Sequence, residues 1–307
     1  KIDYIIMKKV IECVPNFSEG RDTARAEKIV EPFRRTEGVK LLNYEMDKDH
    51  NRMVVTAVGE PKFLANAVVD AVGIAIEVID MRRHKGQHPR MGAVDVIPFI
   101  PVKNTTMDEA IELSKEVAKT VWEKYRLPAF LYEASTDNPL HKNLADIRRG
   151  QFEEMPQKIK LPEWKPDFGE AYIHPTAGVV AIGARMPLIA FNVNLDTNSI
   201  TIANKIAKAI RHSNGGLRYC KAIGIELKER NITQVSMNLT DYTRTPIYRV
   251  VELVRIEAKR YGVNIVGSEI VGLVPMEALV DAVTYYMGLE GFGIEKVLES
   301  HLTDLIQ

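Results

Sequence analysis

Cysteine is scarce in this chain, and neither sign of charge dominates it. The only two cysteines, Cys13 and Cys220, are too few for a disulfide framework and are typical of a reducing compartment such as the cytoplasm. Lysine plus arginine and aspartate plus glutamate number 41 each, which argues against a surface that binds nucleic acid or membrane as a whole. No apolar run approaches the roughly 18 residues of a membrane span, so we expect a cytoplasmic protein without one.

The apolar residues that are present suffice for a sizeable core. Hydrophobic residues make up 46% of the chain and charged residues 27%, which is ordinary globular usage. A length of 307 residues suggests about two domains of roughly 150 residues each. Met7 is the first methionine, so we expect residues 1–6 to be an addition to the native chain that takes no part in the fold.

Hydrophobic periodicity predicts the same order of strands and helices twice. The first half predicts strand 10–16, helix 21–35, strand 39–45, strand 52–59, a helix from Pro61 and strand 93–102. The second half predicts strand 187–195, a helix around 203–210, strands 222–229 and 234–240, a helix around 247–254 and strand 263–275. This βαββαβ order is the ferredoxin-like pattern. We therefore expect an α/β (α+β) protein of two ferredoxin-like subdomains, 7–184 and 185–307, with facing sheets and outer helices.

Between the two repeats the pattern predicts a helix over 107–125, a strand over 129–134 and then a long irregular stretch. Residues 161–185 contain three prolines, three glycines and the three aromatic residues Trp164, Phe168 and Tyr172. Long irregular stretches inside a compact chain are usually functional or disordered, and the aromatic content argues against disorder here.

One short stretch, RRHKGQHPR (82–90), concentrates positive charge in an otherwise neutral protein. His84 and His88 have the spacing of two metal ligands on a helix, but Gly86 and Pro89 disfavour a helix here. The neighbouring cations Lys85 and Arg90 would repel a metal ion, and no HExxH glutamate is present, so we expect no metal.

Two other interpretations of this stretch remain open. Arg82 and Arg83 could be solvated residues that favour the end of the preceding helix dipole. His88 lies between a glycine-containing turn and a strand, where loops often present catalytic groups.

A nucleic-acid-binding ferredoxin-like protein is the non-enzyme alternative, but the strands 52–59 and 234–240 lack the aromatic residues that stack on bases.

Several motifs together resemble those of the glutamate formimidoyltransferase family, the formiminotransferase domain of formiminotransferase-cyclodeaminase. They are IECVPNFSEGRD (11–22), DHNRMVVTAVG (49–59), IDMRRHKGQHPRMGAVDVIPFIPV (79–102), WKPDFG (164–169) and SEIVGLVP (268–275). The resemblance runs from about Val10 to the C-terminal region. It implies two α/β subdomains facing each other across a folate-binding groove, usually in a homodimer.

The resemblance also implies an activity and a set of site residues. The family transfers the formimino group of N-formimino-L-glutamate to N5 of tetrahydrofolate, a co-substrate, and releases glutamate. Its catalytic histidine corresponds to His88, and its folate-binding segment corresponds to Gly169, Glu170, Ala171, Tyr172, Ile173, His174, Pro175, Thr176, Ala177 and Gly178.

This chemistry explains a basic stretch in a neutral protein. A neutral imidazole can take the N5 proton and return it to the leaving glutamate nitrogen, which is the role expected of His88. Guanidinium groups bind carboxylates in bidentate fashion, and an acidic neighbour favours the cationic, more electrophilic formimino group. We therefore expect the substrate-binding residues to be Glu45, Arg82, Arg83, His84 and Arg90, of which His84 or Arg90 would orient His88.

Two further expectations follow from the resemblance. The matching motifs include no cyclodeaminase, so a separate cyclodeaminase would act on the product. An enzyme that metabolises 5-formyltetrahydrofolate, by formyltransferase or cyclo-ligase activity, remains the alternative, because the sequence does not distinguish formimino from formyl donors.

Overall fold

The computed structural model describes residues 9–48, 50–86 and 88–302, so residues 1–6, set aside above, lie outside the described part. The chain is a mixed α/β protein with two sheets, and it divides into two compact units. Unit 1 ends at Arg185 and unit 2 begins at Met186. No helix in the described ranges is long and apolar enough to span a bilayer.

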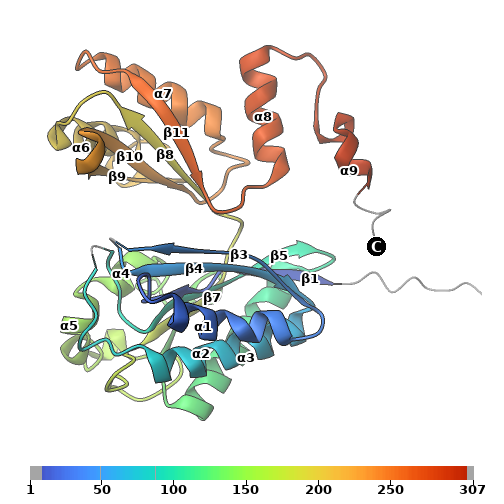
Figure 1. Ribbon diagram of the computed structural model, residues 1–307, viewed down its shortest axis with the longest axis vertical. Coiled ribbons are helices and arrows are strands. Elements are labelled where there is room, and N and C mark those ends of the chain that lie inside the picture. Colours follow the sequence, from blue (N-terminus) through green and yellow to red (C-terminus); the bar gives the residue numbers. More distant parts are fainter. Residues whose placement is uncertain (1–8, 49, 87, 303–307) are drawn as a thin grey trace, which may run out of the picture. The chain divides into compact units, whose positions relative to one another are not determined.

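Unit 1 contains a seven-stranded mixed sheet (Figure 1). Its strands are β1 (Val10–Cys13), β2 (Asn16–Phe17), β3 (Val39–Asp47), β4 (Arg52–Gly59), β5 (Val94–Lys103), β6 (Ala129–Glu133) and β7 (Val180–Ala184). The strand order is β1-β4-β2-β5-β7-β6, with β3 on the outer side of β4. Both β1 and β2 pair with β4 and β5, so they form one strand interrupted at Pro15, which has no N–H to donate.

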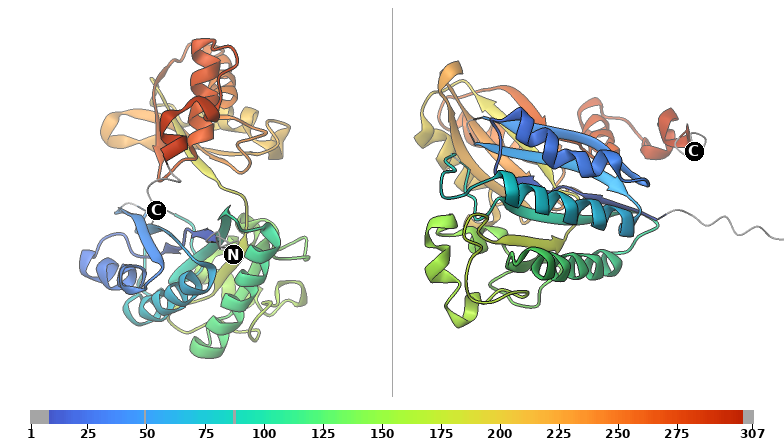
Figure 2. Two further views of the ribbon diagram at one scale, coloured as in Figure 1. Left: turned by 90° about the vertical axis from the view of Figure 1, so that its right-hand side faces the viewer. Right: turned by 60° about the horizontal axis from the view of Figure 1, so that its bottom comes forward.

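Three long helices cover one face of this sheet (Figure 1). They are α1 (Thr23–Arg35), α2 (Pro61–Val78) and α3 (Met107–Tyr125). Asp22 caps α1 by accepting two backbone N–H bonds, Pro61 opens α2, and Thr106 and Glu109 form a capping box on α3. The helices α2 and α3 pack side by side, and their apolar faces bury against the sheet in the main core (Figure 2).

The opposite face of the sheet is covered at β6 and β7 by short helices. These are α4 (Leu144–Arg148), α5 (Gln151–Lys158) and the 3₁₀ helix η1 (Pro162–Trp164). Along β6, Ala129 and Leu131 belong to the main core, whereas Phe130 and Tyr132 belong to a second cluster with Ile147 of α4. The alternation of a strand thus places two separate cores on the two faces.

Unit 2 contains a four-stranded antiparallel sheet of order β11-β8-β10-β9. Its elements are β8 (Ile189–Leu195), α6 (Ile200–Ile210), η2 (His212–Asn214), β9 (Cys220–Leu227), η3 (Lys228–Arg230), β10 (Ile232–Leu239), α7 (Ile247–Lys259), β11 (Ile265–Val271), α8 (Met276–Met287), η4 (Ile294–Lys296) and α9 (Leu298–Leu302). Alternate residues of β8 and β10 face α6 and α7 and form a core of their own.

The predicted βαββαβ order is confirmed in both units, with element ends that differ by a few residues. The irregular stretch predicted over 161–185 contains η1 and ends in β7, which joins the sheet of unit 1 between β5 and β6. The helices α4, α5, α8 and α9 were not predicted.

Candidate active site

A small pocket in unit 1 lies where three strands meet their loops. The strand β2 ends beside it, and β4 and β5 both begin there. Its lining residues are Phe17, Ser18, His50, Asn51, Arg52, His84, His88, Arg90 and Asp95. Three of the predicted site residues therefore converge on one pocket: His84, His88 and Arg90.

Asn51 joins the loops that form this pocket. Its side chain accepts the N–H of Gly20 at 3.0 Å and donates to the carbonyl of Lys85 at 3.1 Å. The backbone of Asn51 has a φ of 49°, in the left-handed region that asparagine tolerates better than most residues. Gly86 approaches so closely that a Cβ there would lie 2.1 Å from the His50 carbonyl oxygen. The loop before His88 thus packs directly on the turn that precedes β4.

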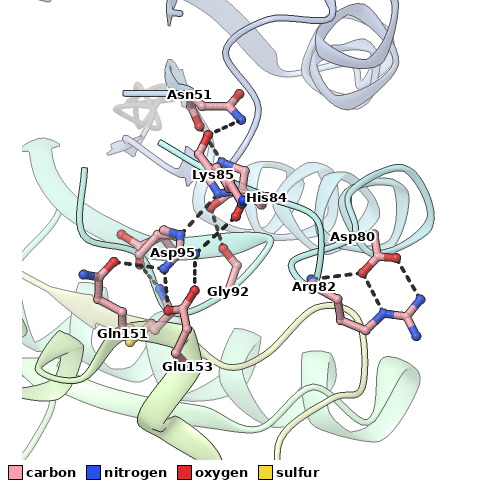
Figure 3. Close-up of polar contacts among 12 residues, drawn as sticks. Asn51, Asp80, Arg82, His84, Lys85, Gly92, Asp95, Gln151 and Glu153 are labelled. Carbon is pink, nitrogen blue, oxygen red and sulfur yellow. Dashed lines mark hydrogen bonds and ion pairs between the residues drawn. The ribbon is translucent and has the colours of Figure 1, made fainter. Parts of the chain in front are cut away.

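His84 supports the loop and has no free ring nitrogen (Figure 3). Its Nε2 lies 2.8 Å from the carbonyl oxygen of Asn51, and its Nδ1 accepts a hydrogen bond from Arg90 Nε at 3.2 Å. Since Arg90 can only donate, the proton of the neutral ring is on Nε2. Burial lowers the pKa of His84, which favours this neutral form.

Arg90 is buried and its donors contact groups of the same chain. Its guanidinium donates to Gln151 Oε1 at 2.9 Å and to both carboxylate oxygens of Glu153, at 2.8 and 2.5 Å. A further donor reaches the carbonyl of His84 at 3.3 Å. The hydrogen bond from Arg90 lowers the pKa of Glu153, so the pair stays ionised. Arg90 therefore anchors the loop to the start of α5.

His88 differs from His84 because its ring has an unused nitrogen. The Nδ1 atom is buried and has no hydrogen-bond partner among the residues that the structure describes. The ring of His50 packs edge-on against it, with centroids 5.9 Å apart. Burial, followed by the positive charges of Arg52 and Arg148, lowers the pKa of His88 to about 2. The imidazole is therefore a neutral base at physiological pH.

Three charged residues lie near His88: the buried Asp95 and the partly buried Arg52 and Arg148. Arg148 pairs with Asp95, whose other oxygen accepts the N–H of Met91 at 3.0 Å. Arg52 donates to the amide oxygen of Asn16. Burial and the charge of Arg148 lower the pKa of Arg52 to about 10, so it remains a cation. None of these three charged residues was among the site residues predicted from sequence.

Arg148 is held in place by a support beneath its helix. Lys158 donates to three carbonyl oxygens at the end of α4, those of Asp146, Ile147 and Arg149, at 2.5, 2.8 and 3.1 Å. Its Nζ also lies 3.9 Å from the centre of the Trp164 ring. Burial lowers the pKa of Lys158 to about 8. The tryptophan of the WKPDFG motif therefore supports the helix that carries Arg148.

The remaining predicted substrate-binding residues lie away from the pocket lining. Arg82 forms a bidentate pair with Asp80, which Figure 3 shows apart from His84 and its partners. The Arg83 side chain is 89% exposed. Glu45 is exposed on β3 and accepts a hydrogen bond from Asn43 at 2.9 Å. Among described residues, the buried carboxylate in the pocket lining is that of Asp95 instead.

The predicted folate segment, 169–178, lies beside both ends of the basic stretch. The carbonyl of Thr176 accepts the N–H of Met81 at 2.8 Å, and Gly178 bridges to Gly92. Gly178 has a φ of +72°, and a Cβ there would lie 2.2 Å from the Met91 carbonyl oxygen. The close approach at this position therefore requires glycine.

Within the segment, aromatic and histidine side chains take different roles. Tyr172 is partly exposed and lies 6.1 Å from the ring of Trp122. The Nδ1 of His174 accepts the N–H of Ala177 at 3.1 Å, which closes the turn, and burial lowers the pKa of His174. The His174 ring therefore holds the turn of this segment, and Tyr172 presents an aromatic surface to solvent.

The described residues contain no group of three or more histidine, cysteine, aspartate or glutamate side chains that could hold a metal ion. The charged groups of the pocket are instead suited to binding an organic anion and to moving a proton.

The comparisons with known proteins point to one family. The model for the formiminotransferase domain, N-terminal subdomain, matches residues 10–185, and the model for the formiminotransferase domain matches residues 190–303. A glutamate formimidoyltransferase of Streptococcus pyogenes serotype M1 is 51% identical over 297 residues, which cover 96% of this chain and 99% of that protein.

Two further relatives extend the match. A glutamate formimidoyltransferase of Thermoplasma acidophilum is 47% identical over 292 residues, covering 94% of this chain and 96% of that protein. A formimidoyltransferase-cyclodeaminase of Dictyostelium discoideum is 43% identical and covers 96% of this chain, but only 56% of its own length is matched. The chain thus corresponds to about half of the two-activity protein.

Proposed function

Because the chain belongs to the formiminotransferase domain family, we propose that it is a glutamate formimidoyltransferase that transfers the formimino group of N-formimino-L-glutamate to N5 of tetrahydrofolate. Two relatives of this name match nearly the whole chain, which supports the activity. The observation that carries the residue assignment is the buried, neutral imidazole of His88 with its unused Nδ1.

The reaction requires one proton to be transferred twice, first from N5 to a base and then from that base to the leaving nitrogen. As N5 of tetrahydrofolate bonds to the formimino carbon, a tetrahedral adduct forms and N5 becomes acidic. His88 accepts that proton, and the resulting imidazolium returns it to the glutamate nitrogen as the bond from carbon to that nitrogen breaks. Glutamate leaves and the neutral base is restored, so the protonation of the enzyme is unchanged after one turnover.

The other pocket histidines are less suited to this role. Both nitrogens of His84 are engaged within the chain. The Nδ1 of His50 lies 3.1 Å from the Asp47 carboxylate. We therefore assign proton transfer to His88 and an orienting role to His84 and Arg90, which hold the loop that carries it.

We also propose that residues 169–178 bind the folate. The supporting observations are the contacts of this segment with both ends of the basic stretch and the exposed ring of Tyr172, which can stack on a planar ligand. The roles of Glu45, Arg82 and Arg83 in binding substrate stay predictions. No metal is part of the proposal.

The finer description of the fold belongs to the same proposal. The strand orders β3-β4-β1-β5 and β9-β10-β8-β11 correspond to each other and support two ferredoxin-like subdomains. Their limits at 7–184 and 185–307 stay a prediction. The mutual orientation of the two sheets stays a prediction. A homodimer, a separate cyclodeaminase and a cytoplasmic location complete the proposal, and the free thiols of Cys13 and Cys220 agree with a reducing compartment.

The activity is tested by mixing the purified protein with tetrahydrofolate and formiminoglutamate and measuring released glutamate together with 5-formiminotetrahydrofolate. A parallel reaction contains 5-formyltetrahydrofolate with glutamate, or with ATP. We expect turnover in the first reaction, and turnover confined to the second would establish the formyl alternative instead. His88→Asn should abolish most of the turnover. The matched control, His212→Asn, changes an exposed histidine of unit 2 and should retain it.

A further inference from the structure

Three buried polar atoms without partners belong to two residues that line the pocket and to Arg148, which pairs with Asp95 of its lining. They are His88 Nδ1, Arg52 Nε and Arg148 Nε, and none of them has a hydrogen-bond partner within the described part of the chain. Buried polar atoms are nearly always satisfied in native proteins, so a group of them in one place needs an explanation. Two of the three are guanidinium donors, which require an acceptor rather than another donor.

The charges around these atoms do not balance. Arg52 and Arg148 are both cations with little exposed surface, and the Arg148 side chain is 15% exposed. Asp95 is the buried carboxylate that pairs with Arg148 and also acts on Arg52. Asp47 also acts on Arg52, but its side chain is half exposed and pairs with His50. The nearby Arg90 is already neutralised by Glu153, and the imidazole of His88 contributes no charge.

Two largely covered cations thus share one buried carboxylate among the described residues of this site. A buried charge is costly unless it is paired, and an oxyanion from outside the chain would supply the missing partner. A carboxylate fits best, because guanidinium groups bind its two oxygens with their fork of N–H donors.

We infer that Arg52 and Arg148 bind the α-carboxylate of formiminoglutamate, and of the product glutamate, beside His88. This inference rests on the proposed function. The α-carboxylate is chosen because only the nitrogen and the α-carbon separate it from the transferred carbon, whereas the γ-carboxylate lies two methylene groups farther away. Both guanidinium groups act electrostatically on His88, so a carboxylate bound by them lies close to the proton that the imidazole transfers.

Binding of the carboxylate would also prepare the base. Burial is the main cause of the low pKa of His88, and the charges of Arg52 and Arg148 lower it further. A bound carboxylate would partly neutralise these two cations, so the pKa of His88 would rise from its value in the free protein. The groups that face His88 are Arg52 of β4, Arg148 of α4, His50 of the turn before β4 and Asp95 of β5. The substrate would thereby activate the base that acts on it.

The test compares two neighbouring arginines of the same helix region. Arg148→Gln removes the guanidinium that is inferred to donate to the substrate carboxylate. Arg149→Gln changes an 80% exposed arginine and is the matched control. We expect Arg148→Gln to raise the KM for formiminoglutamate roughly 10- to 100-fold, the effect of losing one hydrogen bond to a charged group. The KM for tetrahydrofolate should change little. Arg149→Gln should leave both values unchanged.

A binding measurement separates this inference from the proposed activity. Glutamate should raise the Tm of the wild-type protein and fail to do so for Arg148→Gln, while tetrahydrofolate raises the Tm of both. If the wild type shows no formimino transfer, the proposed function fails. A glutamate effect on Tm that disappears in Arg148→Gln would still establish the carboxylate site.

Two outcomes would overturn the inference. One is an unchanged KM for formiminoglutamate in both Arg148→Gln and Arg52→Lys, with a large rise in Arg82→Gln or Arg83→Gln. The other concerns the wild type and needs no variant to fold: 2-aminobutyrate keeps the α-carboxylate and 4-aminobutyrate keeps only the γ-carboxylate. We expect 2-aminobutyrate to be the better competitive inhibitor against formiminoglutamate, and the reverse order would refute the assignment.

Discussion

The neutrality of His88 has a consequence for stability that can be measured without any substrate. In the unfolded chain this histidine has an ordinary pKa near 6.5, whereas burial and two arginines lower the pKa to about 2 in the fold. As the pH falls below 6.5, the unfolded chain takes up a proton that the fold excludes. The titration of His88 therefore leaves the free energy of unfolding at its full value above pH 6.5 and lowers it progressively toward pH 2.

The size of the effect follows from these two pKa values. Between pH 7 and pH 5 the unfolded histidine becomes almost fully protonated, while the folded one remains neutral. The linkage relation then gives a loss of about 2 kcal/mol of unfolding free energy from this residue alone. His88→Gln removes the titrating group, so its loss between the same two pH values should be smaller by about 2 kcal/mol.

Urea unfolding at both pH values measures this difference. The only two tryptophans, Trp122 and Trp164, both lie in unit 1, so their fluorescence reports the unfolding of the unit that contains His88. His212→Gln, in unit 2, is the control and should lose as much stability on acidification as the wild type. Equal losses in the wild type and His88→Gln, or a His88 ring resonance that titrates near pH 6.5 in the folded protein, would refute the reasoning.

Three further predictions concern the loop and its support. His88→Asn should lower kcat roughly 10²- to 10⁴-fold with little change in folate binding measured by calorimetry, and a near-normal kcat with an inactive His84→Asn would show that the wrong histidine was chosen. Gly86→Ala should lower kcat by about 10²-fold, since its Cβ would collide with the His50 carbonyl and displace the loop, and unchanged steady-state kinetics would contradict this. Lys158→Met should destabilise unit 1 by about 2 kcal/mol in urea unfolding, because three carbonyl oxygens at the end of α4 lose their donor; no change would mean that the lysine is dispensable.

Local patterns in the sequence predicted much of the fold. The alternation of apolar residues in the strands and their three- and four-residue spacing in the helices depend on neighbouring residues only, so both βαββαβ orders were predicted correctly. The helices α4 and α5 were missed because they are short, and each holds a single fully buried residue, too few for a helical period. The strand β7 could not be assigned to a sheet position, because its parallel partners β5 and β6 are chosen by tertiary packing.

The basic stretch was found from sequence, but the direction of each side chain was not. Along a loop, spacing does not determine which residues face inward, so the sequence could not separate Arg82 and Arg83, which lie outside the pocket, from Arg90, which lies inside it. Arg52 lies in the motif DHNRMVVTAVG, and Asp95 is a charged residue within an apolar strand. The sequence could therefore have indicated both as site residues.

Arg148 had no such signal, and only the tertiary structure brought it to Asp95 and His88. The residues between them form other elements of the fold, and no local pattern encodes a contact across them. The sequence by itself determined the elements and the reactive residue types, because those depend on local periodicity and on side-chain chemistry. The tertiary structure decided the charge balance around His88, because burial and long-range ion pairs exist only once the chain has folded.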